Sequence, residues 1–210
     1  RKPHHREIDS RLASRRGLLD TDELLTFNIP LTYTLPVTIP IAYPPSGRLS
    51  DLRAQGSTSV PIQSYVPVSV DQLQGVDSRL TNQDIVQEVR IDSVTMVVES
   101  NTLTDVALQP FEFRVGEPGV QVLAAELAGG DFENAMIAAV VPAQSPGFTG
   151  SVPGQIVDAN RSPIGRRIAE LDFGIGIGTS LLLDGQIPEG GKAEVKFTIR
   201  LVFVVKPLGN

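Results

Sequence analysis

The chain has 210 residues, of which 41% are hydrophobic and 20% are charged, a composition typical of a globular protein. It contains no cysteine, which excludes disulfide bonds and thiolate chemistry and leaves the hydrophobic core to stabilise the fold. No apolar run approaches the roughly 18 residues that a membrane-spanning helix needs, so the sequence predicts no transmembrane segment.

Basic residues are concentrated at the N-terminus. Residues 1–17 carry six basic and two acidic residues (6 − 2 = +4), whereas the remainder carries 12 basic and 22 acidic residues (12 − 22 = −10). Acidic residues early in this segment, arginines late in it and Gly17 after them favour a short helix. We predict a basic arm over residues 1–26, able to contact nucleic acid through residues 1–16 or an acidic neighbouring copy. The arginines expected to make these contacts are Arg6, Arg11, Arg15 and Arg16.

Two stretches alternate apolar and polar residues, and the prolines of each fall on one parity. In residues 27–43 the odd positions are apolar and Pro30, Pro36 and Pro40 are even; in residues 60–70 the parity is reversed. Alternate residues of a strand turn their N–H groups to opposite edges, so each stretch predicts a strand with one blunted edge and one pairing edge. The pairing partner is either this domain or another subunit. The predicted contact positions of the first strand are Ile29, Leu31, Tyr33, Leu35, Val37 and Ile39.

Further strands are predicted in the middle of the chain. Residues 85–99 alternate, and their apolar parity changes near Asp92 and Ser93, which indicates a β-bulge. Residues 106–115 also alternate and predict the next strand.

The segment that follows has mixed signals. Its Ala-rich residues 122–128 favour a short helix, and the apolar run at 136–141 favours a buried strand. Residues 142–167 are rich in Pro, Gly, Ser and Asn, which predicts the least ordered part of the domain.

The C-terminal third predicts a hairpin of two strands, over 168–183 and 193–205. In the last strand the odd positions are apolar and the early even positions are polar or charged, which indicates a sheet with one face in water and antiparallel pairing. Seven or eight such strands without alternating helices predict one all-β domain over 27–210, an antiparallel β-sandwich of Greek-key or jelly-roll type.

Gly174, Gly176 and Gly178 alternate with apolar residues in the first strand of this pair. Their spacing does not fit a phosphate-binding loop, because no Lys-Ser/Thr pair follows. A strand face without side chains allows close approach by a backbone or a flat group. The three glycines therefore indicate either a bent internal strand or a docking surface for another chain.

Candidate catalytic groups are sparse. The only two histidines, His4 and His5, lie in the arm, and spacing does not assign a pair of carboxylates to acid–base work, because strands bring distant residues together. We predict a protein that is not an enzyme and has no cofactor or metal site. Because the chain begins with Arg1 and is β-rich without cysteine, we also expect a processed, extracytoplasmic protein, either periplasmic, secreted or surface-located.

The order of arm and body carries a resemblance. A basic arm ahead of a β-sandwich is similar to the layout of many viral coat proteins, and the stretch 94–115 with its central Asn101 resembles sandwich domains of late-embryogenesis-abundant type. We predict a structural or assembly protein that packs by strand and arm contacts with copies of itself or a larger complex. The alternatives are a coat or shell subunit whose arm contacts nucleic acid, and a module that binds a small ligand or lipid.

Overall fold

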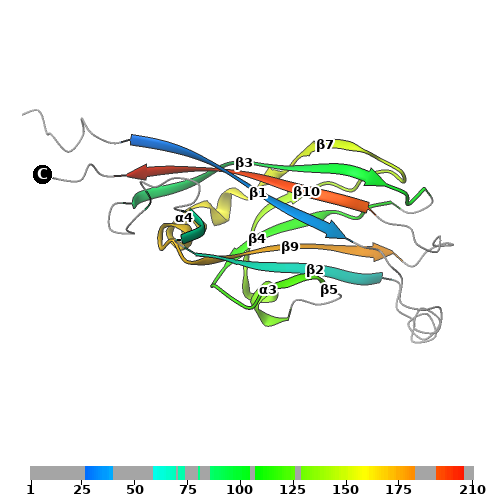
Figure 1. The fold of residues 1–210 in the computed structure, drawn as a ribbon, viewed down its shortest axis with the longest axis horizontal. Coiled ribbons are helices and arrows are strands. Elements are labelled where there is room, and N and C mark those ends of the chain that lie inside the picture. Colours follow the sequence, from blue (N-terminus) through cyan, green and yellow to red (C-terminus); the bar gives the residue numbers. More distant parts are fainter. Residues whose placement is uncertain are drawn as a thin grey trace, which may run out of the picture.

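Two antiparallel β-sheets pack face to face in the computed structural model of the chain (Figure 1). The structure describes residues 27–39, 59–69, 71–73, 80, 86–104, 107–125, 129–182 and 193–205. The predicted helical arm over residues 1–26 lies outside this described part. The smaller sheet has the strand order β1-β10-β3-β7, and the larger has the order β5-β2-β9-β4-β6-β8.

The elements follow one another along the chain with short helices between some of the strands. The strands are β1 (Phe27–Ile39), β2 (Ser59–Val68), β3 (Val86–Asn101), β4 (Phe111–Gly116), β5 (Val122–Ala125), β6 (Met136–Val141), β7 (Gly150–Pro153), β8 (Gln155–Ile156), β9 (Phe173–Leu182) and β10 (Ala193–Val205). The helices are α3 (Gly130–Asn134), the 3₁₀ turn η2 (Asp158–Asn160) and α4 (Arg161–Ala169).

The strand order is that of a jelly roll. When the short strands β5 and β8 are set aside, eight strands remain, and the chain changes sheet at every step except from β4 to β6. Numbered in chain order, the two sheets then read 1-8-3-6 and 2-7-4-5, two interlocked Greek keys. The predicted all-β antiparallel sandwich is confirmed.

Large apolar side chains from both sheets fill the space between them. The rings of Phe111 in β4 and Phe197 in β10 face each other across the sandwich, with centroids 5.6 Å apart. Each such fully buried side chain contributes about 1.5–3 kcal/mol to folding. The largest buried members of this core are the phenylalanines Phe111, Phe113, Phe173, Phe197 and Phe203.

The outer face of the smaller sheet is polar, as the alternation in β10 predicts. Odd positions of β10 from Ala193 to Phe203 are buried, whereas Lys196 is half-buried and Arg200 is exposed, and both pair with acids of β3. Lys196 Nζ lies 2.5 Å from Glu99 Oε1, and Arg200 Nε lies 3.4 Å from Asp92 Oδ2. Exposed pairs of this kind contribute about 0–1 kcal/mol, so burial of the opposite face stabilises the strand.

The predicted bulge in β3 is confirmed at Asp92. Arg200 pairs with Ser93, but the next residue of β10, Leu201, pairs with Ile91, so Asp92 has no partner in the ladder. One extra residue in β3 reverses the parity of its inward side chains, which is the change seen in the sequence.

The helix predicted over 122–128 is wrong. Residues 122–125 form strand β5, which pairs with β2, and the helix α3 begins later, at Gly130. The backbone pairing offered by the edge of β2 outweighs the intrinsic helix preference of a short Ala-rich segment.

The low order predicted for residues 142–167 is also wrong, because this segment contains β7, β8 and most of α4. Its few apolar residues include Ile164, which lies on the same face of α4 as Ile168, the residue just after the segment, and both are 1% exposed. Since Ile168 belongs to α4, the strand predicted to begin there begins at Phe173.

The predicted hairpin between the last two strands is wrong as well. β9 lies between β2 and β4 in the larger sheet, and β10 lies between β1 and β3 in the smaller one. The two strands are thus consecutive in sequence but belong to opposite layers, as Greek-key connections require.

Candidate functional site

The first proline-marked strand pairs with its own chain. β1 forms the end of the smaller sheet and runs antiparallel to β10 over its whole length without a register shift. Of the two predicted alternatives, pairing within the domain is therefore the one observed. The ladder continues past Pro30 and Pro36, and proline has no N–H to give it, so we infer that these positions turn their nitrogens to the outer edge.

The register places the predicted contact positions of β1 opposite buried positions of β10. Leu31 pairs with Leu201, and Tyr33 pairs with Ile199. Contact of this strand with another chain stays a prediction. The arm residues predicted to share in that contact, Arg6, Arg11, Arg15 and Arg16, lie outside the described residues.

The second proline-marked strand, β2, is covered on its other edge only in part. β9 pairs with all of β2, whereas β5 pairs with it only at Gln63 and Tyr65. These two residues lie between Pro61 and Pro67, so the prolines bound the stretch where a further strand is added.

The glycine face of β9 is occupied by aromatic side chains of the same chain. A Cβ at Gly174 would lie 2.2 Å from the Tyr65 hydroxyl oxygen, and one at Gly178 would lie 2.3 Å from Phe132 Cζ. At Gly176 the nearest atoms belong to both rings. The flat group that approaches these glycines is thus internal, and β9 is an internal strand, as one of the two predicted alternatives has it.

Tyr65 is fully buried beneath the loop that follows β4. Its hydroxyl donates a hydrogen bond of 2.6 Å to the carbonyl oxygen of Glu117. Burial, reinforced by the carboxylates of Asp131 and Glu117 and opposed by Arg167, raises the pKa of Tyr65 to about 12. The neutral phenol is therefore a fixed structural donor at neutral pH.

Arg114 of β4 holds the short helix α3 over the glycine face. Its guanidinium lies 4.6 Å from the centroid of the Phe132 ring and donates from Nη1 to the carbonyl oxygens of Phe132 and Glu133, both at 3.2 Å. It also pairs with Glu112, at 2.6 Å. No periodic pattern singles out this arginine, because its partners are backbone carbonyls of a distant turn.

Two surface pockets accompany these elements. One, of about 220 Å³, lies over the larger sheet and includes Arg114, Phe132 and Thr179. The other, of about 290 Å³, lies between β3 and α4 and includes Arg90 and Arg161, neither of which the sequence patterns single out.

The described residues include no group of three or more His, Cys, Asp or Glu side chains placed to hold a metal ion. In the same part of the chain, none of the helices has the length and apolar character needed to cross a membrane. The extracytoplasmic location stays a prediction.

No protein-family model matches the chain, and no curated protein matches it. Among solved structures it is similar to the 60-mer BFDV capsid protein, at 13% identity over 88% of this chain and 96% of that chain, with a TM-score of 0.41. It is also similar to mud crab tombus-like virus, at 10% identity over 100% and 94% of the two chains and a TM-score of 0.42. It is similar as well to the semi-empty virus-like particle of the giant freshwater prawn Macrobrachium rosenbergii nodavirus, at 12% identity over 100% of this chain and 95% of that chain, with a TM-score of 0.38. Because the TM-scores are this low, the fold rests on the strand order itself.

Proposed function

We propose that this chain is a non-catalytic structural subunit that assembles with copies of itself into a shell, and that its basic arm contacts nucleic acid. The observation that carries the proposal is the eight-strand jelly-roll order in a sandwich filled by its own side chains. Jelly rolls of this kind occur in viral coat, lectin and cupin domains, an analogy at the level of the fold.

The filled interior favours a building block over a container for a ligand. Phe111 and Phe113 from one sheet and Phe197 and Phe203 from the other are each at most 1% exposed. A module that binds a small ligand or lipid between its sheets needs a cavity of several hundred Å³ there, and these rings occupy that space.

The sheet edges favour assembly through faces, ends and the arm. The outer edge of β1 carries Pro30 and Pro36, and β7, at the other end of the smaller sheet, ends in Pro153. Because proline removes a ladder donor, neither edge suits continued strand addition. A unit whose smaller sheet has two blunted edges supports closed packing of separate subunits over growth of that sheet.

The charge of the arm supports its proposed partner. Residues 1–17 have a balance of +4 on a chain whose remainder has a net charge of −10. Phosphate backbones are bound by arginine and lysine with release of counterions, so such an arm suits a polyanion.

The test compares the full chain with two arm variants by sedimentation velocity and by salt-dependent binding to a single-stranded oligonucleotide. In one variant Arg6, Arg11, Arg15 and Arg16 are replaced by Gln, and in the matched control by Lys. We expect the full chain to form closed assemblies. The slope of log affinity against log salt is negative, and we expect its magnitude to decrease by about 3 in the Gln variant only. A monomer at all concentrations, with and without oligonucleotide, would overturn the shell proposal; equal slopes in both variants would overturn the role of the arm.

A further inference from the structure

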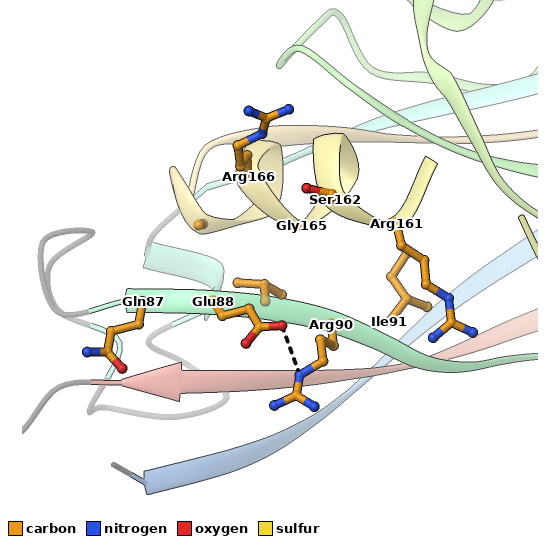
Figure 2. Close-up of a pocket in the computed structure, with 10 residues that line it drawn as sticks. Gln87, Glu88, Arg90, Ile91, Arg161, Ser162, Gly165 and Arg166 are labelled. Atoms are coloured by element: carbon orange, nitrogen blue, oxygen red, sulfur yellow. Dashed lines mark ion pairs between the residues drawn. The ribbon is translucent and has the colours of Figure 1, made fainter. Parts of the chain in front are cut away.

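The pocket between β3 and α4 combines a defined cavity with a local excess of positive charge. It measures about 290 Å³, and its charged lining residues are Glu88, Arg90, Arg161 and Arg166, a balance of 3 − 1 = +2. Figure 2 shows Arg90 and Arg161 extending to the same side of the seam between helix and strand, with Arg166 on the other side of α4. This balance opposes the net negative charge of the rest of the domain.

The walls of this pocket are fixed by close packing. β7 pairs with β3 only at Thr95–Val98, and beside the first part of β3 the helix α4 takes the place of a strand. Gly165 lies so near the strand that a Cβ there would be 2.4 Å from the Val89 carbonyl oxygen. Ile164 and Ile168 anchor the same helix in the core, so the arginines project from a rigid seam.

The two arginines on the same side are held by partners that a stronger anion can replace. Arg90 Nε lies 3.1 Å from Glu88 Oε1, and Arg161 Nε lies 2.6 Å from Asp158 Oδ1. The side chains of Arg90 and Arg161 are 58% and 56% exposed, and ion pairs this exposed contribute about 0–1 kcal/mol. A backbone phosphate accepts two parallel hydrogen bonds from one guanidinium, as a carboxylate does, so it can compete with these weak exposed ion pairs.

The pocket lies at the end of the sandwich where the arm joins it. Phe27, the first residue of β1, pairs with Val205, and Val205 pairs with Val86, the first residue of β3. The pocket begins one residue further on, at Gln87. The junction of the basic arm with the sandwich and the basic pocket thus lie at the same end of the described domain, which favours a single extended anion over separate carboxylates of a neighbouring copy.

We propose that the pocket between β3 and α4 binds a phosphate of the nucleic-acid backbone, with Arg90 and Arg161 as its direct ligands. The proposal rests on the proposed function, because the nucleic acid is the one that the arm contacts. Ser162 and Gln87 also line the pocket and offer neutral hydrogen-bond donors elsewhere along it. The domain, although its net charge is negative, would therefore contribute one phosphate site in addition to the contacts proposed for the arm.

The experiment uses the full chain and a matched pair of double variants. Arg90→Gln/Arg161→Gln removes the two pocket ligands, and Lys196→Gln/Arg200→Gln removes two cations of β10 that are 43% and 54% exposed, are paired with acids and do not line the pocket. Affinity for a single-stranded oligonucleotide is measured over a range of salt, in parallel with sedimentation velocity. For the pocket variant we expect the slope of log affinity against log salt to be smaller in magnitude by about 1.4. We also expect its affinity at 0.1 M salt to be lower by on the order of tenfold. The β10 variant should stay within about twofold of the unmodified chain.

Equal losses in the two variants, or no loss in either, would overturn the pocket as a phosphate site while leaving arm-dependent binding and assembly intact. Loss of assembly in the pocket variant with unchanged oligonucleotide binding would also overturn it, and would assign the pocket to carboxylates of a neighbouring copy. Saturable binding of inorganic phosphate that depends on Arg90 and Arg161, without a change in the oligonucleotide slope, would leave a free-anion site instead. Arg90→Lys/Arg161→Lys keeps the charge and should keep the slope, which separates ligand loss from misfolding.

Discussion

The ring of Tyr65 covers Gly174 so closely that a Cβ at position 174 would lie 2.2 Å from the Tyr65 hydroxyl oxygen. The ring cannot retreat, because its hydroxyl is held by the Glu117 carbonyl and no part of the residue is exposed. Glycine alternates in β9 because Tyr65 from β2 and Phe132 from α3 pack directly against this strand on the outer face of the larger sheet.

Replacing Gly174 by Ala should lower the free energy of unfolding by about 1–3 kcal/mol, the usual cost of overpacking a site that cannot relax. Gly130→Ala is the matched control, because a Cβ there would meet only Asn134 Nδ2, at 3.7 Å. Chemical denaturation of both variants measures the difference. Equal stability of the two variants would show that Tyr65 does move aside.

The raised pKa of Tyr65 makes stability depend on alkaline pH. The folded pKa of about 12 lies above the ordinary tyrosine value of 10.0, so the folded state holds its proton more tightly than the unfolded state. This contribution is fully present below pH 10 and is lost as the pH rises from 10 through about 12. Denaturation midpoints across this range should fall less steeply for Tyr65→Phe, which has no proton to lose; an unchanged pH dependence would contradict the assignment to Tyr65.

Arg114→Gln should destabilise the protein by about 2 kcal/mol, because the carbonyls of Phe132 and Glu133 then lose a charged donor and the Phe132 ring loses its cation. Arg90→Gln offers the comparison, since its only described pair, with Glu88, is exposed and its loss should cost less than about 0.5 kcal/mol. A double-mutant cycle of Arg114→Gln with Phe132→Leu measures the coupling directly. A coupling near zero would show that the ring contact contributes nothing.

Restoring backbone donors to the outer edge of β1 should make the chain associate into open aggregates. Pro30→Thr/Pro36→Thr adds two N–H groups to that edge, whereas Thr34→Val raises strand preference without adding a donor. Light scattering at fixed protein concentration should rise with time for the double proline variant and stay flat for Thr34→Val. Equal scattering from both would mean that the prolines do not guard this edge.

Sequence patterns predict the parts of this fold that depend on alternation within one strand. The bounds of β10, its wet face and the bulge at Asp92 all follow from which side chains turn inward. Pairing between distant strands does not follow, because alternation says which face is buried but not which strand lies alongside. The predicted hairpin of β9 and β10 is wrong for that reason, and β5 is missed because its strand state depends on the edge of β2.

Sequence patterns likewise predict some features of the candidate site but not the partners of those features. The parity of Pro30 and Pro36 predicts a blunted edge, and the spacing of Gly174, Gly176 and Gly178 predicts a close approach, but neither says that Tyr65 and Phe132 provide it. The pocket arginines come from β3 and α4, about 70 residues apart in the sequence, and are brought together only when α4 packs beside β3.

The pairing of Phe27 with Val205 has a practical consequence for anything joined to this sandwich. The first and last described strands begin and end side by side, so a group inserted directly before Phe27 or directly after Val205 starts from the same end of the described domain (Figure 1). The opposite side, where Ile39 pairs with Ala193, is free of both fusion points. Labels placed there would leave the end that carries the pocket between β3 and α4 undisturbed.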